Sequence, residues 1–297
     1  MGKTGKGKKK KSVASLYLSL VRHIKRNHKA YIVYVIIQTA VVFTLIRSIL
    51  EARWENVATC VFAQILLLLP PLLEKGVKIN LPTTMEVVAY VFVFAAEILG
   101  EVGNYYEKVP YWDTALHTLS GFMFAAFGFC LVDIFNRNDR FSFKLAPGYL
   151  AFMAFCFSMT IGVCWELFEH TADSYLGFDM QKDTVVTSFQ SVYLDENKSN
   201  YPVPVKNIKH TEIVCEDGDT VEIEGGYLDI GIHDTIDDLF VNLIGAVTFS
   251  LSGYFFMKFG GNSRFVESLV PVPVDEADAP DASAGKENSE DSASAEE

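Results

Sequence analysis

Six stretches of the chain are apolar over a length that suits a membrane crossing. They cover roughly residues 31–50, 54–73, 84–102, 113–135, 147–170 and 234–257. A helix needs about 20 apolar residues to cross the hydrocarbon core of a bilayer. Lipid offers no hydrogen bonds to a backbone, so such segments should be helices. The pattern therefore predicts an all-α polytopic membrane protein with about six transmembrane helices.

Polar stretches divide these spans into two blocks. Residues 30–173 hold the first five predicted helices, 234–258 hold the sixth, and 174–233 form a long polar insertion between them. The insertion contains three strand-like stretches, and Asp217-Gly218 is a hairpin-turn signal between the last two. We expect a small β-rich extramembrane cap, with strands within VVTSFQSVYL (185–194), VKNIKHTEIVC (205–215) and TVEIE (220–224).

The formal net charge of -12 is unevenly distributed along the chain. Residues 1–29 form a basic leader, and residues 259–297 form an acidic tail whose composition predicts disorder. The second half of the leader mixes apolar and basic residues, which favours an amphipathic helix on anionic lipid. A solvated leader that only sets the topology explains the pattern equally well. Its lysines lack interleaved aromatic residues, which argues against nucleic-acid binding.

The distribution of lysine and arginine predicts which loops face the cytoplasm. If the N-terminus is inside, the short inside loops 74–83 and 136–146 hold five lysines and arginines, whereas the short outside loops 51–53 and 103–112 hold one each and the long segment 171–233 is acidic. Cytoplasmic loops are enriched in these residues. We therefore expect a multi-pass plasma-membrane protein with both termini in the cytoplasm and the β-rich insertion outside.

This topology brings polar residues of several predicted helices to the outer membrane face. The fourth predicted span begins there, the fifth ends there and the sixth begins there. Glu97 and Glu101 lie at the outer end of the third. Random placement would scatter such residues over both faces, so we expect a single site formed by Asp113, His117, Glu166, Glu169, Asp234, Asp238 and Asn242.

Ordinary helix chemistry explains some of these residues. Asp113 and Asp234 suit the N-caps of their helices, but Asn242 lies too deep for capping. Glu166 and Glu169 lie near a helix C-terminus, where an acidic side chain opposes the helix dipole. Ionisable residues within membrane helices are costly and mark functional sites. A structural network that holds the helices together remains the alternative for the set.

Carboxylates together with imidazole suit a divalent metal such as zinc, manganese or iron. The candidate metal ligands are His117, Glu166, Glu169 and Asp238. The same groups also suit a proton relay or a general acid–base pair. The chain contains no HExxH motif, and no P-loop or GxGxxG motif that would predict a nucleotide cofactor. The five cysteines lack CxxC spacing, so neither a disulfide framework nor a structural zinc site is expected.

The polar stretches also resemble those of a known group of proteins. The sequence resembles the YjdF-like family of uncharacterised bacterial inner-membrane proteins, and more loosely the VanZ-like proteins linked to glycopeptide tolerance. The resemblance implies a six-helix membrane fold over about residues 31–257 and brings no established activity. It rests on WDTALHTLSGF (112–122), WELFEHTADSYLG (165–177), DMQKDTVV (179–186) and HDTIDDLFVNLIGA (233–246).

Three functional hypotheses follow from the sequence. The first is a metal-dependent site at the outer face that acts on an envelope or lipid-headgroup substrate. The second is a proton- or cation-coupled transporter, which needs a polar path to the inner face. The inner halves of the last three spans are apolar apart from Asp133, which we place near enough to the inner surface to be solvated. The third hypothesis is a scaffold with a structural polar network. The sequence does not indicate the oligomeric state.

Overall fold

The computed structural model describes residues 27–77, 79–137, 145–259 and 272–273. Most of the predicted basic leader and most of the predicted acidic tail lie outside these residues, so the expectations for them stay predictions. One part of the tail is described: β8 (Val272–Pro273) pairs antiparallel with β1 (Ile79–Asn80). The expected disorder of the tail therefore does not extend to these two residues.

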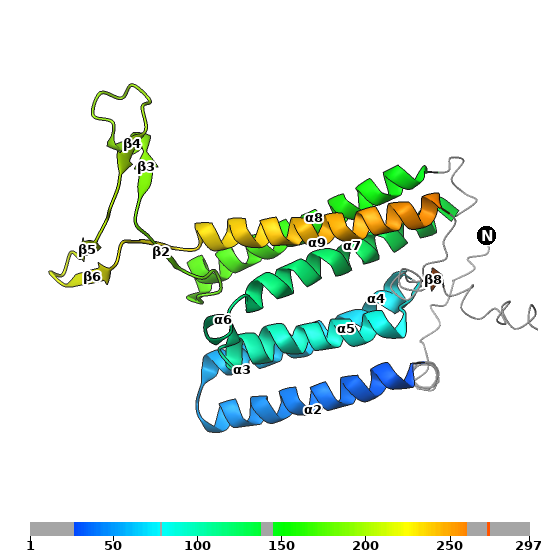
Figure 1. Cartoon of the computed structure of the whole chain (residues 1–297). Helices are drawn as coiled ribbons and strands as arrows, with labels where there is room; N and C mark the ends of the chain where they lie inside the picture. The colour runs from blue at the N-terminus through cyan, green and yellow to red at the C-terminus, as the bar shows by residue number, and fades with distance from the viewer. Residues whose placement is uncertain (1–26, 78, 138–144, 260–271, 274–297) are drawn as a thin grey trace, which may run out of the picture. The chain divides into compact units, whose positions relative to one another are not determined.

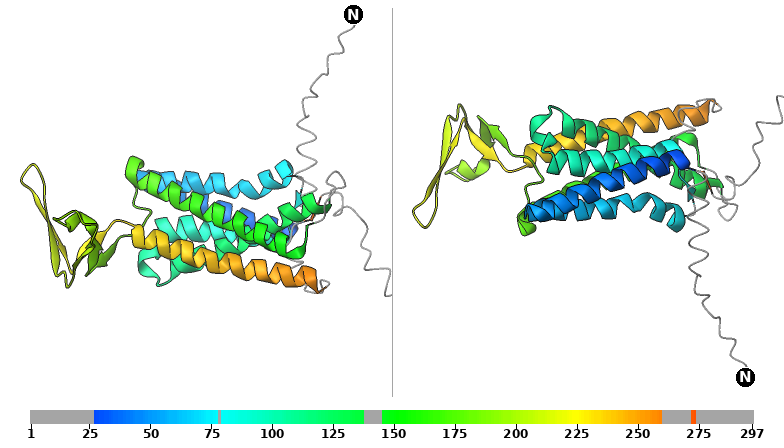
Figure 2. Two further views of the ribbon diagram at one scale, coloured as in Figure 1. Left: turned by 90° about the horizontal axis from the view of Figure 1, so that it is seen from above. Right: turned by 90° about the horizontal axis from the view of Figure 1, so that it is seen from below.

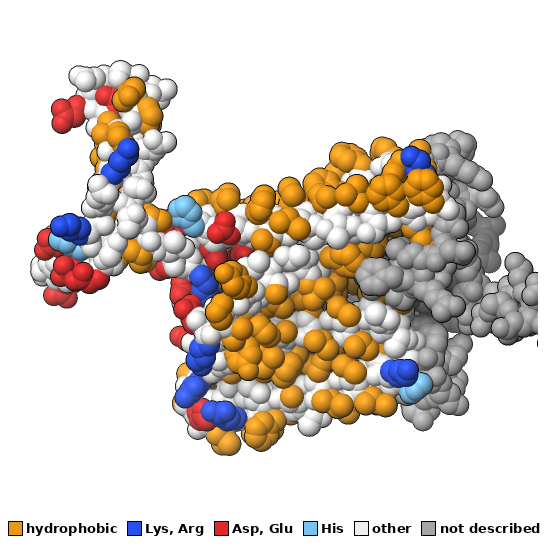
Figure 3. All heavy atoms as spheres, viewed as in Figure 1, with side chains coloured by type: hydrophobic (Ala, Val, Ile, Leu, Met, Phe, Trp, Pro, Cys, Tyr) orange, Lys and Arg blue, Asp and Glu red, His pale blue; other side chains and the backbone are white. Residues whose placement is uncertain are grey.

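Within the described residues, five helices are long and apolar enough to cross a membrane. They are α2 (His28–Leu50), the segment Trp54–Leu73, α7 (Trp112–Arg137), α8 (Pro147–Leu176) and α9 (Ile232–Lys258). Figure 3 shows hydrophobic side chains along the sides of the helices and charged side chains near helix ends. The predicted helical membrane fold with small β hairpins is confirmed.

Two predicted spans are interrupted helices. Trp54–Leu73 consists of α3 (Trp54–Leu67) and the start of α4 (Leu69–Val77), with the break next to Pro70 and Pro71, where the sequence predicts a kink or exit. The third predicted span, 84–102, is made of α5 (Thr83–Val93) and a π-helix, η1 (Phe94–Val102). Neither α5 nor η1 alone reaches the length of a membrane crossing. The third predicted span is therefore not among the five long helices.

The chain folds as two compact units, and each is described by itself. Of the described residues, the first comprises 27–77, 79–112, 129–137, 145–150, 252–259 and 272–273. In it α2 packs against α3 and α5 (Figure 1), and the short α6 (Tyr105–Lys108) contacts η1. The core of this unit consists of Ile37, Val41, Cys60, Ala63, Leu67, Tyr90 and Ile98.

The second unit comprises residues 113–128 and 151–251, and in it glycines bring the helices α7, α8 and α9 close together. A Cβ atom on Gly245 of α9 would lie 2.1 Å from the carbonyl oxygen of Thr118 on α7. A Cβ atom on Gly121 of α7 would lie 2.2 Å from the carbonyl oxygen of Asn242. Small residues permit this approach in membranes, where helices gain stability mainly from close packing.

We therefore expect Gly245→Ala to destabilise the protein, because the added methyl group collides with the backbone of α7. The cost should be about 1–3 kcal/mol, the usual cost of overpacking. Gly148→Ala is the matched control, since its Cβ would lie 3.8 Å from its nearest neighbour, on Tyr254. Thermal unfolding of the two variants in detergent tests this difference. Equal melting temperatures would contradict the close helix contact.

The insertion between α8 and α9 forms three two-stranded antiparallel sheets. β2 (Thr184–Val186) pairs with β7 (Tyr227–Asp229), β3 (Phe189–Ser191) with β4 (Val203–Val205), and β5 (His210–Val214) with β6 (Thr220–Glu224). A 3-10 turn, η2 (Val192–Leu194), follows β3. Gly218 has φ +91°, which confirms the predicted turn between β5 and β6. Figures 1 and 2 show β2 nearest to α8 and α9 and the other strands farther from them.

Asp195 organises the loop between β3 and β4. Its Oδ2 accepts hydrogen bonds from the backbone and hydroxyl groups of Ser199, at 2.7 Å each, and from the backbone of Tyr201 at 3.2 Å. The Ser199 hydroxyl is the main cause of a lowered Asp195 pKa, and the Tyr201 N–H contributes next.

A lowered pKa means that ionised Asp195 stabilises the loop above its unfolded pKa, and that this stabilisation is lost as the pH falls through the folded pKa. We expect amide hydrogen exchange in residues 195–201, corrected for intrinsic rates, to accelerate at acid pH. Asp195→Asn should show the faster exchange already at neutral pH. Exchange independent of pH in the wild-type loop would contradict this role.

Candidate functional site

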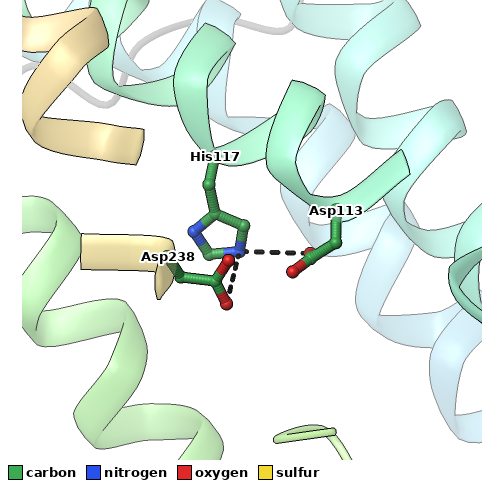
Figure 4. A group of neighbouring side chains, drawn as sticks. All are labelled: Asp113, His117 and Asp238. Atoms are coloured by element: carbon green, nitrogen blue, oxygen red, sulfur yellow. Dashed lines mark ion pairs between the residues drawn. The ribbon is translucent and has the colours of Figure 1, made fainter. Parts of the chain in front are cut away.

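Three side chains from α7 and α9 converge in the second unit. Asp113 and His117 lie one turn apart on α7, and Asp238 approaches them from α9 (Figure 4). The Nε2 atom of His117 is 3.4 Å from Oδ1 of Asp113 and 3.7 Å from Oδ2 of Asp238. The i,i+4 spacing on α7 places the first two residues on one helix face.

Two glutamates of α8 complete the cluster. Oε1 of Glu166 lies 3.7 Å from Nδ1 of His117, so both ring nitrogens of the histidine face carboxylates. Glu166 and Glu169 are 5% and 7% exposed, and Oε2 of each makes no hydrogen bond. We call Asp113, His117, Glu166, Glu169 and Asp238 the carboxylate–histidine cluster. The ion pairs that Asp113, Glu166 and Asp238 form within the described residues are all with His117.

The cluster contains two sets of ligand atoms. One set is Asp113, His117 and Asp238, and the other is Glu166, Glu169 and Asp238. Within each set, one ligand atom from each residue lies within 4.8 Å of the others. The predicted metal ligands His117, Glu166, Glu169 and Asp238 are thus brought together, and Asp113 joins them. Carboxylates and imidazole are donors that divalent first-row metals accept.

Trp165 holds Glu169 of the cluster in place through a hydrogen bond. Its indole N–H donates a 2.8 Å hydrogen bond to Oε1 of Glu169, one turn farther along α8. This bond leaves Oε2 as the carboxylate oxygen without a partner. Groups that orient a ligand in this way typically contribute 10–100-fold to metal affinity.

We expect Trp165→Phe to weaken divalent-cation binding by about 10–100-fold. An aromatic ring is kept, whereas the five-membered ring and its hydrogen bond to Glu169 are lost and the metal ligands themselves are untouched, so the number of bound cations should not change. Equilibrium dialysis with Mn²⁺ measures both quantities. An unchanged affinity would show that the hydrogen bond does not position Glu169 for binding.

The loop after α8 folds against the helix ends beside the cluster. The backbone N–H groups of Met180 and Gln181 donate to the carboxylate of Asp173, at 2.7 and 2.8 Å. The backbone N–H of Lys182 donates to Oδ2 of Asp234 at 2.7 Å, and the Gln181 side chain donates to the hydroxyl of Thr235. Of the β-rich insertion, residues 180–182 therefore contact the helix ends directly.

These contacts change the explanation of Asp234. α9 begins at Ile232, and the carboxylate of Asp229 accepts the His233 N–H at 2.8 Å near the start of that helix. Asp234 lies inside the first turn of α9 and accepts the backbone N–H of Lys182, which anchors the loop. The prediction that Asp234 is the N-cap of this helix is therefore wrong. Sequence reasoning missed the roles of Asp229 and Gln181, because both depend on how the insertion returns to the helices.

Asn242 joins helices one turn below Asp238. It is 1% exposed, its Oδ1 accepts a 3.4 Å hydrogen bond from Ser120 on α7, and its Nδ2 lies 3.5 Å from the sulfur of Met159 on α8. A Cβ atom on Gly162 of α8 would lie 2.6 Å from Nδ2. The described contacts of Asn242 thus give it a packing role, and its predicted part in the site's chemistry stays a prediction.

Shape should therefore matter more than polarity at position 242. We expect Asn242→Leu, which keeps the branched shape, to cost about 1 kcal/mol, near the small value of a membrane hydrogen bond. Asn242→Ala should cost about 2–3 kcal/mol, because a cavity remains among three helices. Thermal unfolding in detergent, combined with metal content, tests this. Loss of metal from a stably folded Asn242→Leu protein would place Asn242 in the site.

Other predicted polar residues stand apart from the cluster. His170 is exposed on α8. Glu97 and Glu101 lie on η1 in the first unit, and their approach to the cluster stays a prediction. Asp133 is only 7% exposed, so our expectation that it is solvated is wrong: the fold buries it despite its place near the end of α7.

Comparison with known proteins supports the reading of a membrane protein without assigning an activity. An uncharacterised protein of Thermotoga maritima is 31% identical over 107 residues, which cover 36% of this chain and 53% of that protein. The chain thus spans about half the length of this curated relative. No solved structure matches the chain. Residues 31–259 match a family described as predicted membrane protein (DUF2238). The match covers most of the chain, which therefore belongs to this family of multi-pass membrane proteins.

Proposed function

We propose that the carboxylate–histidine cluster binds a divalent metal and that the protein acts on the polar headgroup of a lipid or envelope substrate at the outer membrane face. The observation that carries this proposal is the pair of buried carboxylate oxygens, Oε2 of Glu166 and Oε2 of Glu169, that make no hydrogen bond. A buried carboxylate oxygen without a hydrogen bond is costly, and a metal ion would satisfy both Oε2 atoms.

The ion pairs of the cluster favour a metal over a purely structural network. A network that joins helices needs a hydrogen-bond donor for each carboxylate. Here His117 is the ion-pair partner of Asp113, Glu166 and Asp238 alike, and an imidazole offers at most two N–H donors. His117 and the Trp165 indole still leave Oε2 of Glu166 and Oε2 of Glu169 without a donor among the described residues.

The depth of the cluster supports a headgroup substrate. α8 has 30 residues and is about 45 Å long, against a hydrocarbon core of about 30 Å. Glu166 lies ten residues before its end, whereas His117 and Asp238 lie five and six residues after the starts of α7 and α9. The cluster is thus within about 15 Å of the helix ends. The lysine and arginine distribution supports placing these ends outside.

The packing of α9 beyond Asn242 supports a site that is reached only from the outer face of the membrane, rather than a path for transport across it. Beyond Asn242 the buried positions of α9 include Gly245, Ala246, Phe249 and Ser250, and the ring centroids of Phe249 and of Phe122 on α7 lie 5.1 Å apart. Among these four buried positions only Ser250 has a polar side chain, and the other three close the contact between α7 and α9 with apolar and backbone atoms. A proton- or cation-coupled transporter would need polar groups to continue there.

A metal held by the cluster would supply Lewis-acid activation of a headgroup oxygen or of water. The protein's own residues would do the rest. The Trp165 indole orients Glu169, and Asp234 holds the loop 180–182 beside the cluster. The buried ring of Phe249 would limit the passage of water deeper between α7 and α9.

Reconstitution tests this function. The full chain is placed in vesicles made from a bacterial lipid extract, with Mn²⁺ or with chelator, and lipid and water-soluble products are followed by mass spectrometry. We expect a new headgroup product that requires both metal and Asp238. Asp237→Asn is the control, because Asp237 is exposed on the same helix, one residue away. Cation flux across the vesicles without any product would instead establish the transporter.

A further inference from the structure

We infer that the carboxylate–histidine cluster holds two divalent cations that share Asp238 as a bridging ligand. One cation would lie among Asp113, His117 and Asp238, and the other among Glu166, Glu169 and Asp238. This inference rests on the proposed function and goes further by stating how many ions the site takes.

Geometry is the first reason. Asp238 belongs to both sets of ligand atoms, and within each set the atoms lie within 4.8 Å of one another. Metal–ligand bonds of about 2.0–2.2 Å span about 4 Å between opposite ligands, so small side-chain movements would close either set around an ion. The two oxygens of one carboxylate can bind two ions, as in two-metal sites with ions about 3.5–4 Å apart.

The buried oxygens of α8 are the second reason. Oε2 of Glu166 and Oε2 of Glu169 make no hydrogen bond, although the two residues are more than nine-tenths buried. Oε1 of Glu169 already accepts from Trp165, and Oε1 of Glu166 faces His117. The two Oε2 atoms are therefore left for a ligand on the α8 side, beside the group that surrounds His117.

Charge is the third reason. The four carboxylates of the cluster carry four negative charges when ionised. One divalent cation would leave two of them to be neutralised by protons in a largely buried site, whereas two cations would balance all four. Uncompensated charge within a membrane protein is strongly unfavourable. Facing helices that supply carboxylates and histidine at i,i+3 and i,i+4 spacing have the general form of carboxylate-bridged di-metal bundles.

The test is the stoichiometry of Mn²⁺ bound to the chelator-treated full chain in detergent, measured by equilibrium dialysis together with EPR. We expect two Mn²⁺ per chain with the EPR signal of an exchange-coupled pair. Glu169→Gln, which keeps the side-chain shape, should bind one Mn²⁺ with the signal of an isolated ion, and so should His117→Ala. Asp237→Asn should bind two.

The outcomes separate this inference from the proposed function. One Mn²⁺ in the wild-type protein, lost equally in Glu169→Gln and His117→Ala, would overturn the second cation and keep a metal site. No bound Mn²⁺ in the wild-type protein would overturn both. The wild-type stoichiometry decides by itself, so the result does not depend on how well any variant folds.

Discussion

Asp238→Asn should abolish the stabilisation of the protein by divalent cations and at the same time stabilise the chelated protein. Asp238 lies 3.7 Å from His117 and belongs to both sets of ligand atoms, so its replacement damages every way of holding a metal here. Even groups that only orient a ligand are worth 10–100-fold in affinity. We expect the loss of a shared ligand to exceed about 100-fold.

The opposite effect without metal follows from like-charge repulsion. Two charges about 5 Å apart repel by roughly 3 kcal/mol at an effective dielectric constant near 20. Wherever the pH is high enough to ionise the carboxylates of the chelated cluster, removing one of them should therefore stabilise the protein, by roughly 1–3 kcal/mol. Thermal unfolding with chelator and with Mn²⁺, beside Asp237→Asn, measures both effects. A variant that is less stable than the wild type under both conditions would indicate a structural network.

Divalent cation should substantially stabilise the wild-type protein against unfolding. A ligand that binds only the folded state stabilises it by about 4 kcal/mol at a concentration 1,000 times its Kd. The cluster is assembled from α7, α8 and α9, so the unfolded chain offers no such site. We expect the melting temperature to rise with Mn²⁺ concentration and to fall on chelation.

A double variant provides the control for this effect. Asp113→Asn combined with Glu169→Gln removes one ligand from each set, and its melting temperature should not respond to the cation. Asp237→Asn should respond like the wild type, because Asp237 is exposed outside the cluster. A similar response in the double variant would mean that the cation acts elsewhere on the protein or on the detergent.

The membrane fold and the main members of the cluster could be predicted because they depend on local patterns and on topology. Hydropathy alone places α2, α7, α8 and α9. Glu166 and Glu169 are three residues apart and therefore lie on the same face of α8. The alternating direction of the spans brings this pair to the same membrane face as His117. The dipole argument that singled out these glutamates does not hold, because α8 continues to Leu176, ten residues beyond Glu166, and the dipole acts within the last turn.

Other features depend on contacts between segments that are distant in the sequence, so no local sequence pattern predicts them. The π-helix η1 has an ordinary apolar composition. A Cβ on its Gly100 would lie 2.4 Å from the ring of Tyr106, a restriction visible only in the folded chain. The packing role of Asn242 depends on Gly162, eighty positions earlier on another helix. Asp234 finds its partner Lys182 only when the insertion folds back.

The metal content of the purified, detergent-solubilised protein tests the central claim most directly. It should be measured beside His117→Ala and Glu166→Ala variants whose thermal stability in chelator matches that of the wild type. We predict stoichiometric divalent metal in the wild-type protein and less in each variant. Absence of metal from all three proteins, even after incubation with Mn²⁺ or Zn²⁺, would contradict the metal site and leave a proton-coupled or structural role for the cluster.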